Sequence, residues 1–235
     1  MPRTPTITQH TTRTARIEHR WPAVFALVVA LVLYGALPND LITVQRYVTV
    51  AIGIVLLIPL IAINPHHMSR QTRWSRTLSL ALAIVIVLSN QITIVSLLLL
   101  LVGGSEEGPS LLQSALQVWV ANVIGFALLY WEIDRGGPVI RTMAKRSDLP
   151  KADFRFPQDE DDDAIDEVSA GSSGTSDWTA SYVDYFYFSL SNSMAFSPTD
   201  AMPLTSRAKL LMSLESFGGF VILALVIARA VSLIG

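Results

Sequence analysis

The run LSLALAIVIVLSNQITIVSLLLLLV, residues 78–102, decides the fold, because it holds 25 consecutive residues without a charge. A helix needs about 20 apolar residues to cross the hydrocarbon core of a bilayer. Further apolar runs cover residues 21–37, 47–63, 111–133 and 210–234. Five such runs in 235 residues leave too little polar chain to cover them in a water-soluble protein. The sequence therefore predicts an all-α, polytopic integral membrane protein. Its expected partner is the lipid bilayer in which it is embedded.

Composition excludes several other classes of protein. The formal net charge is −2, which offers no electrostatic basis for binding nucleic acid. The chain has no cysteine, so it contains neither a disulfide framework nor a thiolate metal site. Four arginines precede the first apolar run, as in a signal peptide, but no small-x-small cleavage site follows it. We therefore expect a retained first helix.

Lysine and arginine alternate between the polar segments. Residues 1–20, 38–46, 64–76, 103–110 and 134–151 carry 4, 1, 3, 0 and 5 of them, respectively. Positive residues accumulate in cytoplasmic loops. We therefore expect a multi-pass protein of the cell membrane, in a bacterial plasma membrane, with a cytoplasmic N-terminus.

The chain divides into four predicted parts. These are a cytoplasmic tail (1–20), a four-helix transmembrane bundle (21–133), a basic-then-acidic linker (134–180) and a C-terminal module (181–235). The linker contains Asp159-Glu-Asp-Asp-Asp163 and a Gly/Ser-rich stretch at 169–176. Clustered acids repel one another and Gly/Ser runs are flexible, which predicts a flexible tether. A divalent-cation sensor is the alternative, but the glycine that an EF-hand loop needs is missing, so no metal site is predicted.

The C-terminal module contains DYFYFSLSNSMAFSPTD, residues 184–200. The aromatic, Ser-rich segment 178–196 is a poor full-length span and predicts a short re-entrant helix. The Ser-Pro-Thr-Asp sequence that follows favours a turn, and a final apolar helix covers 208–234. We therefore expect about five spanning helices plus the re-entrant one. A sixth full span, with both termini inside, is the alternative.

Residues 182–234 resemble the pore helix, filter and inner helix of bacterial two-transmembrane potassium channels, a pore-loop family. Such channels read Tyr-Phe-Ser, a few residues, Thr-Val-Gly-Tyr-Gly-Asp, a short polar turn and a long helix. The resemblance implies conduction of monovalent cations by a homo-oligomer, a tetramer by analogy, because one pore loop cannot close a ring. The filter-like positions are Ser193, Met194, Ala195, Phe196 and Ser197, and the inner-helix hinge-like positions are Gly218 and Gly219.

The filter-like positions differ from the family pattern in a way that affects selectivity. A potassium filter replaces the hydration shell of the ion with rings of backbone carbonyls. Glycine reaches the required backbone angles at little steric cost. Ala195 and Ser197 stand in place of the two glycines, so weak or altered selectivity is expected. For Gly218 and Gly219, close helix packing by small residues is the alternative to a hinge.

Several polar residues lie inside the apolar runs, where such groups are costly and mark functional sites by default. The amides are expected to form inter-helix hydrogen bonds. Glu215 is expected to pair with Arg207 or Lys209, or to line a cavity. The intramembrane polar residues are Asn90, Gln91, Gln117, Asn122 and Glu215.

No catalytic motif occurs in the chain, so an enzyme is not expected. The function predicted first is cation conduction with weak or altered selectivity. The alternative is a non-conducting membrane scaffold or regulatory protein descended from a channel. A solute transporter with Asn90, Gln91 and Glu215 around a central site ranks last, because no inverted repeat is evident. Water-facing residues at 193–197 favour a pore, and residues packed against other helices favour a scaffold.

Overall fold

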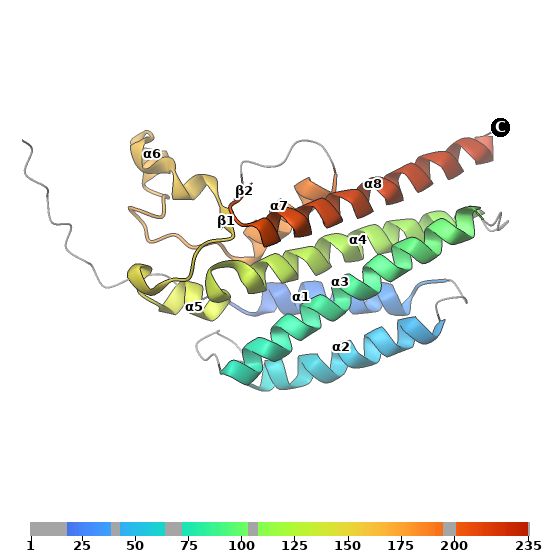
Figure 1. The fold of residues 1–235 in the computed structure, drawn as a ribbon, viewed down its shortest axis with the longest axis horizontal. Coiled ribbons are helices and arrows are strands. Elements are labelled where there is room, and N and C mark those ends of the chain that lie inside the picture. The colour runs from blue at the N-terminus through green and yellow to red at the C-terminus, as the bar shows by residue number, and fades with distance from the viewer. Residues whose placement is uncertain (1–17, 39–42, 64–71, 103–107, 195–200, 235) are drawn as a thin grey trace, which may run out of the picture.

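A computed structural model describes residues 18–38, 43–63, 72–102, 108–194 and 201–234 (Figure 1). The fold is 79% helical, so the predicted all-α class is confirmed. The α-helices are α1 (Trp21–Gly35), α2 (Thr43–Ile63), α3 (Arg73–Val102), α4 (Gly108–Ile133), α5 (Pro138–Met143), α6 (Asp166–Ser169), α7 (Tyr182–Ser193) and α8 (Ser206–Ile234). Short 3₁₀ turns are η2 (Asp134–Gly136), η3 (Arg146–Asp148), η4 (Pro157–Asp159) and η5 (Asp161–Asp163), and the two strands are β1 (Phe154–Arg155) and β2 (Met202–Pro203).

Four of the described helices are long and apolar enough to cross a membrane, namely α2, α3, α4 and α8. The fifth predicted span, α1, is apolar but has 15 residues. At 1.5 Å per residue it is about 22 Å long, against a hydrocarbon core of about 30 Å. The predicted polytopic bundle is therefore confirmed, with one member shorter than a full span.

Helices α1 to α4 run up and down, and α8 runs antiparallel to α4 (Figure 1). Arg20, just before α1, donates a hydrogen bond to the carbonyl of Leu60 near the end of α2. Arg207, at the start of α8, binds Asp153, which follows α4. We term this end, where α1, α3 and α8 begin and α2 and α4 end, the basic end. The helix directions thus agree with the alternation of lysine and arginine along the sequence.

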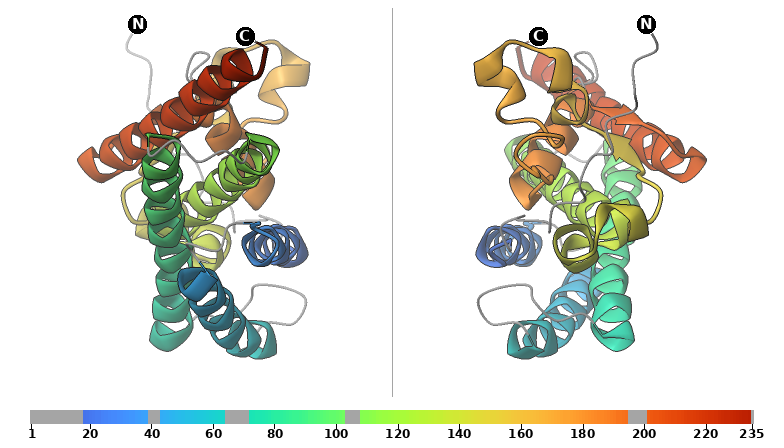
Figure 2. Two further views of the ribbon diagram at one scale, coloured as in Figure 1. Left: turned by 90° about the vertical axis from the view of Figure 1, so that its right-hand side faces the viewer. Right: turned by 90° about the vertical axis from the view of Figure 1, so that its left-hand side faces the viewer.

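Helix α4 is the centre of the bundle and packs against α1, α3, α7 and α8 (Figure 2). Its side chains Phe126, Ala127 and Tyr130 are completely buried. Helix α2 lies at the edge and packs against α1 and α3. Its outward residues, such as Val44 and Ile58, are exposed and apolar, as expected for a surface that faces lipid.

Residues 134–180 differ from the flexible tether that was expected. They form short helices, 3₁₀ turns and strand β1, and they bury Phe154 and Phe156 in the core. The ring of Phe154 lies 5.0 Å from that of Tyr130 and 5.1 Å from that of Phe188, both in edge-on contact. Large aromatic rings bury much apolar area when they pack. This favourable burial holds the segment against the bundle, although most of its other residues are polar.

Helix α7 does not cross the bundle. It has 12 residues, about 18 Å at the rise of an α-helix. Strand β2, which follows it, pairs antiparallel with β1, which precedes it, so the chain enters and returns at the basic end. The predicted re-entrant helix is therefore present, and the alternative of a sixth full span is wrong.

The tip of α7 is packed tightly on α8. A Cβ atom placed on Gly219 would lie 2.4 Å from the carbonyl oxygen of Ser193. A Cβ atom on Gly218 would instead meet the side-chain ends of Ile94 and Gln91 at 3.2 and 3.4 Å. The backbones of α7 and α8 therefore touch at Gly219, which supports the close-packing interpretation of this pair of glycines.

We expect Gly219→Ala to lower the melting temperature in detergent, because the added methyl group pushes the tip of α7 off α8. Overpacking of this kind costs about 1–3 kcal/mol. Gly218→Ala is the matched control, because it gains the same helix propensity, about 1 kcal/mol, and meets only movable side chains. Equal melting temperatures for the two variants would contradict the close contact.

Candidate functional site

The carboxylate of Glu215 in α8 is completely buried and joins three helices. It accepts hydrogen bonds from the hydroxyl of Tyr130 in α4 at 2.7 Å and from the amide of Asn192 in α7 at 2.6 Å. The hydroxyl of Ser189, also in α7, donates a third. The ion pair that was expected with Arg207 is not formed, because Arg207 binds Asp153 instead. This Glu215 cluster consists of Tyr130, Ser189, Asn192 and Glu215.

A second buried polar cluster joins α1, α3 and α4, and contains the expected inter-helix hydrogen bonds. The amides of Asn90 and Gln91 both donate to the side-chain oxygen of Asn122, at 2.8 and 2.9 Å. The hydroxyl of Tyr34 donates to Asn90 at 3.1 Å. Gln117, one or two turns away on α4, contributes a buried amide oxygen with no hydrogen-bond partner among the described residues.

The two clusters are neighbours in the interior. Asn122 of the second cluster precedes Val123, whose carbonyl oxygen lies 2.8 Å from the hydroxyl of Ser189. Gln91 reaches the backbone of α8 at Gly218, one turn from Glu215. Polar side chains from α1, α3, α4, α7 and α8 therefore form a connected layer through the middle of an otherwise apolar bundle.

The filter-like residues begin where α7 ends. Ser193 is only 3% exposed and faces Gly219, whereas Met194 is 43% exposed. Ala195, Phe196 and Ser197 lie outside the described residues. The carbonyl end of a helix carries a partial negative charge of about half an electron. The tip of α7 therefore brings this negative end close to the carboxylate of Glu215.

The opposite end of α7 is held at the basic end. The carboxylate of Glu18 accepts the backbone N–H of Tyr182 at 2.5 Å and the indole N–H of Trp131 at 3.1 Å. Asp184 accepts the backbone N–H of Ser181 at 2.7 Å, which completes a capping box. The start of α7 is thus fixed by a residue that precedes α1 by only three positions.

Sequence analysis missed a further buried cluster, in the turn after α4. Asp134 is completely buried and accepts the hydroxyl of Tyr185 at 2.5 Å and the backbone N–H of Asp153 at 2.7 Å. Arg141, also completely buried, donates to the carbonyls of Trp131 and Asp134 and lies 4.9 Å above the ring of Tyr185. The signal in the sequence is EIDRGGP, residues 132–138, in which charged residues and a pair of glycines follow an apolar run.

Within the described ranges, no group of three or more His, Cys, Asp or Glu side chains is placed to hold a metal ion. Arg135 binds Asp159 at 2.6 Å, which uses one member of the acidic run in an ion pair.

We expect Glu215→Leu to lower stability by several kcal/mol, because it leaves the buried hydroxyl of Tyr130 and one amide N–H of Asn192 without an acceptor, at about 1–3 kcal/mol each. Glu215→Gln keeps one acceptor oxygen and should lose less. The control is Ser213→Ala, an exposed position on the same helix. Thermal unfolding in detergent provides the measurement, and equal losses for Leu and Gln would show that the hydrogen bonds are unimportant.

The pH dependence of stability should report on Glu18. Burial raises the pKa of the Glu18 carboxyl above its ordinary value of 4.5, and Arg141 offsets part of this increase. The folded protein then holds the proton more tightly than the unfolded chain, so the contribution of Glu18 to stability is present below pH 4.5 and falls as pH rises through the folded pKa. The glutamine of the Glu18→Gln variant cannot titrate. The melting temperature of the wild type, compared with that of this variant, should therefore fall as the pH rises over that range.

The matched control for this titration is Glu167→Gln, since Glu167 is an exposed carboxylate on α6. Its melting temperature relative to the wild type should not change with pH in the same way. A wild-type advantage over Glu18→Gln that grows with rising pH would mean that attraction to Arg141 outweighs burial.

Comparisons with protein-family models, with curated proteins and with solved structures gave no match.

Proposed function

We propose that this protein conducts monovalent cations across a bilayer as an oligomer, and that the tip of α7 lines the path. The observation that carries the proposal is the course of the chain around α7, which enters the bundle for 12 residues and returns to pair with the strand that precedes it. Irregular backbone at membrane depth is tolerated only inside protein or beside water. A re-entrant segment of this kind is therefore suited to line a path for water and ions.

The charge at the end of α7 favours cations. Helix α7 points its carbonyl end, which is partially negative, into the bundle. The side-chain oxygens of Glu215 lie next to this end and accept a hydrogen bond from Asn192. An anion would meet the carbonyl end of the helix unfavourably.

An oligomer is required because one chain contributes one re-entrant helix. The outer faces of α7 and α8 offer apolar surface for contact between copies, with Val183, Tyr187, Phe217 and Phe220 all more than half exposed. Extended exposed apolar surface marks interaction with protein or lipid. The family resemblance favours four copies, and Ala195 and Ser197 favour weak selectivity.

A non-conducting scaffold or regulatory membrane protein is the second candidate. Ser193 favours it, because this filter-like residue is packed against α8 instead of facing open space. The transporter hypothesis receives less support, since Asn90 and Gln91 bind Asn122 while Glu215 binds Tyr130 and Asn192, so their polar groups do not converge on one cavity.

The test is a flux assay on purified protein in liposomes, comparing K⁺, Na⁺ and an impermeant organic cation. We expect flux of both metal ions, with little discrimination between them. Ala195→Trp should block it, because the indole fills the proposed path. Val231→Trp is the control, since Val231 is exposed near the far end of α8.

The oligomeric state of each sample should be measured alongside the flux. Absence of flux from a folded, oligomeric wild-type protein would overturn constitutive conduction and favour the scaffold. Equal flux from both tryptophan variants would place the path away from the α7 loop.

A further inference from the structure

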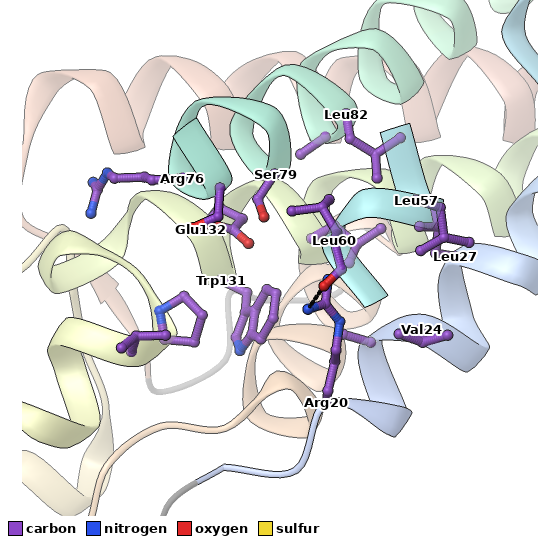
Figure 3. A pocket seen from close by; sticks show the side chains of 16 residues that line it. Arg20, Val24, Leu27, Leu57, Leu60, Arg76, Ser79, Leu82, Trp131 and Glu132 are labelled. Carbon is purple, nitrogen blue, oxygen red and sulfur yellow. Dashed lines mark hydrogen bonds between the residues drawn. The ribbon is translucent and has the colours of Figure 1, made fainter. Parts of the chain in front are cut away.

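A second feature of the bundle, independent of α7, is a pocket at the basic end between α1, α2, α3 and α4 (Figure 3). The cavity that its walls enclose is small, about 70 Å³, and the space around it is open to the outside.

The inner wall of the pocket is apolar and comes from three helices. Val24 and Leu27 belong to α1, Leu57 and Leu60 to α2, and Leu82 to α3 (Figure 3). This lining has no charged group and suits a hydrocarbon chain. A small hydrophilic anion would leave it empty or filled with water.

The other part of the lining is polar and carries a net positive charge. Arg20 and Arg76 contribute two positive charges, and Glu132 contributes one negative charge. Arg20 is held in place by its hydrogen bond to the carbonyl of Leu60. The hydroxyl of Ser79 bonds to the carboxylate of Glu132. The carboxylate of Glu132 therefore already has a hydrogen-bond partner. The three charged side chains together give the pocket the net charge of one guanidinium group.

The turn after α4 lies beside the charged groups of Arg76 and Glu132. Gly137 has a φ of 92°, a conformation that favours glycine. A Cβ atom at this position would lie 3.6 Å from Nη1 of Arg76 and 3.7 Å from Oε2 of Glu132. Gly137 is therefore required by its backbone conformation, and the turn that it forms lies beside both charged groups at the edge of the pocket.

The charged part of the pocket lies at the ends of the long helices, where hydrocarbon gives way to lipid head groups. Trp131, which also lines the pocket, is of the residue type enriched at this level of a membrane. The apolar part extends from there between the helices. This order of charge and hydrocarbon matches that of a lipid molecule.

We propose that this pocket binds an anionic phospholipid, with its phosphate at Arg20 and Arg76 and one acyl chain along the apolar wall. Arginine binds phosphate through paired, charge-assisted hydrogen bonds. Basic pockets between transmembrane helices on the cytoplasmic side suit anionic head groups. The head group of a zwitterionic lipid also carries a positive charge. In this pocket two arginines would repel that charge, and the carboxylate of Glu132 is already hydrogen-bonded. The site does not depend on conduction through α7.

The test is native mass spectrometry of the purified full-length protein, with phosphatidylglycerol, phosphatidylcholine or inorganic phosphate added in separate arms. We expect retention of phosphatidylglycerol over the other two. Arg76→Gln should weaken that retention at least about tenfold, since it removes a charge-assisted hydrogen bond to the phosphate. Arg76→Lys should recover part of the binding. The control is Arg73→Gln, which removes an exposed charge from the same helix without touching the pocket.

A second variant tests the apolar wall. Leu57→Phe narrows the pocket without changing its charge and should reduce retention of phosphatidylglycerol, even if Arg76→Gln fails to fold. Equal retention of the two lipids would overturn the proposal. An equal loss of phosphatidylglycerol retention in Arg73→Gln and Arg76→Gln would show that surface charge alone causes the effect. Binding of inorganic phosphate as strong as that of the lipid would show an anion site in which the acyl chain has no role.

Discussion

The placement of α7 depends on the carboxylate of Glu215. In a bilayer no water is available to satisfy a buried polar group, so its partners must come from the protein. Tyr130, Ser189 and Asn192 supply them from two other helices. Because all three donors point at one acceptor, α7 has one register against α4 and α8 in which these bonds form. The contact of Ser193 with Gly219 then sets how closely α7 approaches α8.

The basic end holds the other end of α7 by a different kind of interaction. Glu18, Asp134 and Arg141 are charged groups at the limit of the apolar region, and each is bonded to backbone or to a neighbouring side chain. A buried charge whose partner is removed is strongly destabilising, so such groups specify an arrangement more than they stabilise it. The aromatic rings of Phe154 and Phe156 fill the space between this cluster and the Glu215 cluster.

These two anchors have a consequence for the proposed conduction. A helix fixed at both ends presents its carbonyl end in a defined position. At this end the filter-like residue Ser193 is held by packing against Gly219 and not by the glycine-based carbonyl cage of a potassium filter. Weak discrimination among cations is the expected result of such an arrangement, because selectivity requires carbonyl rings of defined geometry. The pocket proposed to bind lipid lies between α1, α2, α3 and α4 and does not involve α7, so the two proposals rest on different parts of the bundle.

The sequence by itself determined the helical class, the approximate spans, the up-and-down order of the helices and the short re-entrant helix. These features follow from local hydropathy and from charge counts, which are sums over neighbouring residues. Tertiary structure alone decided which groups meet. Glu215 was expected to pair with nearby Arg207 or Lys209, yet it bonds to Tyr130, 85 positions away. The linker was expected to be flexible from its acids and glycines, but Phe154 and Phe156 fit a space formed by α4 and α7. The pocket combines four helices and the turn after α4, in which Gly137 lies beside Arg76 and Glu132. Such partnerships depend on the packing of segments far apart in the chain, which no local sum of residue properties contains.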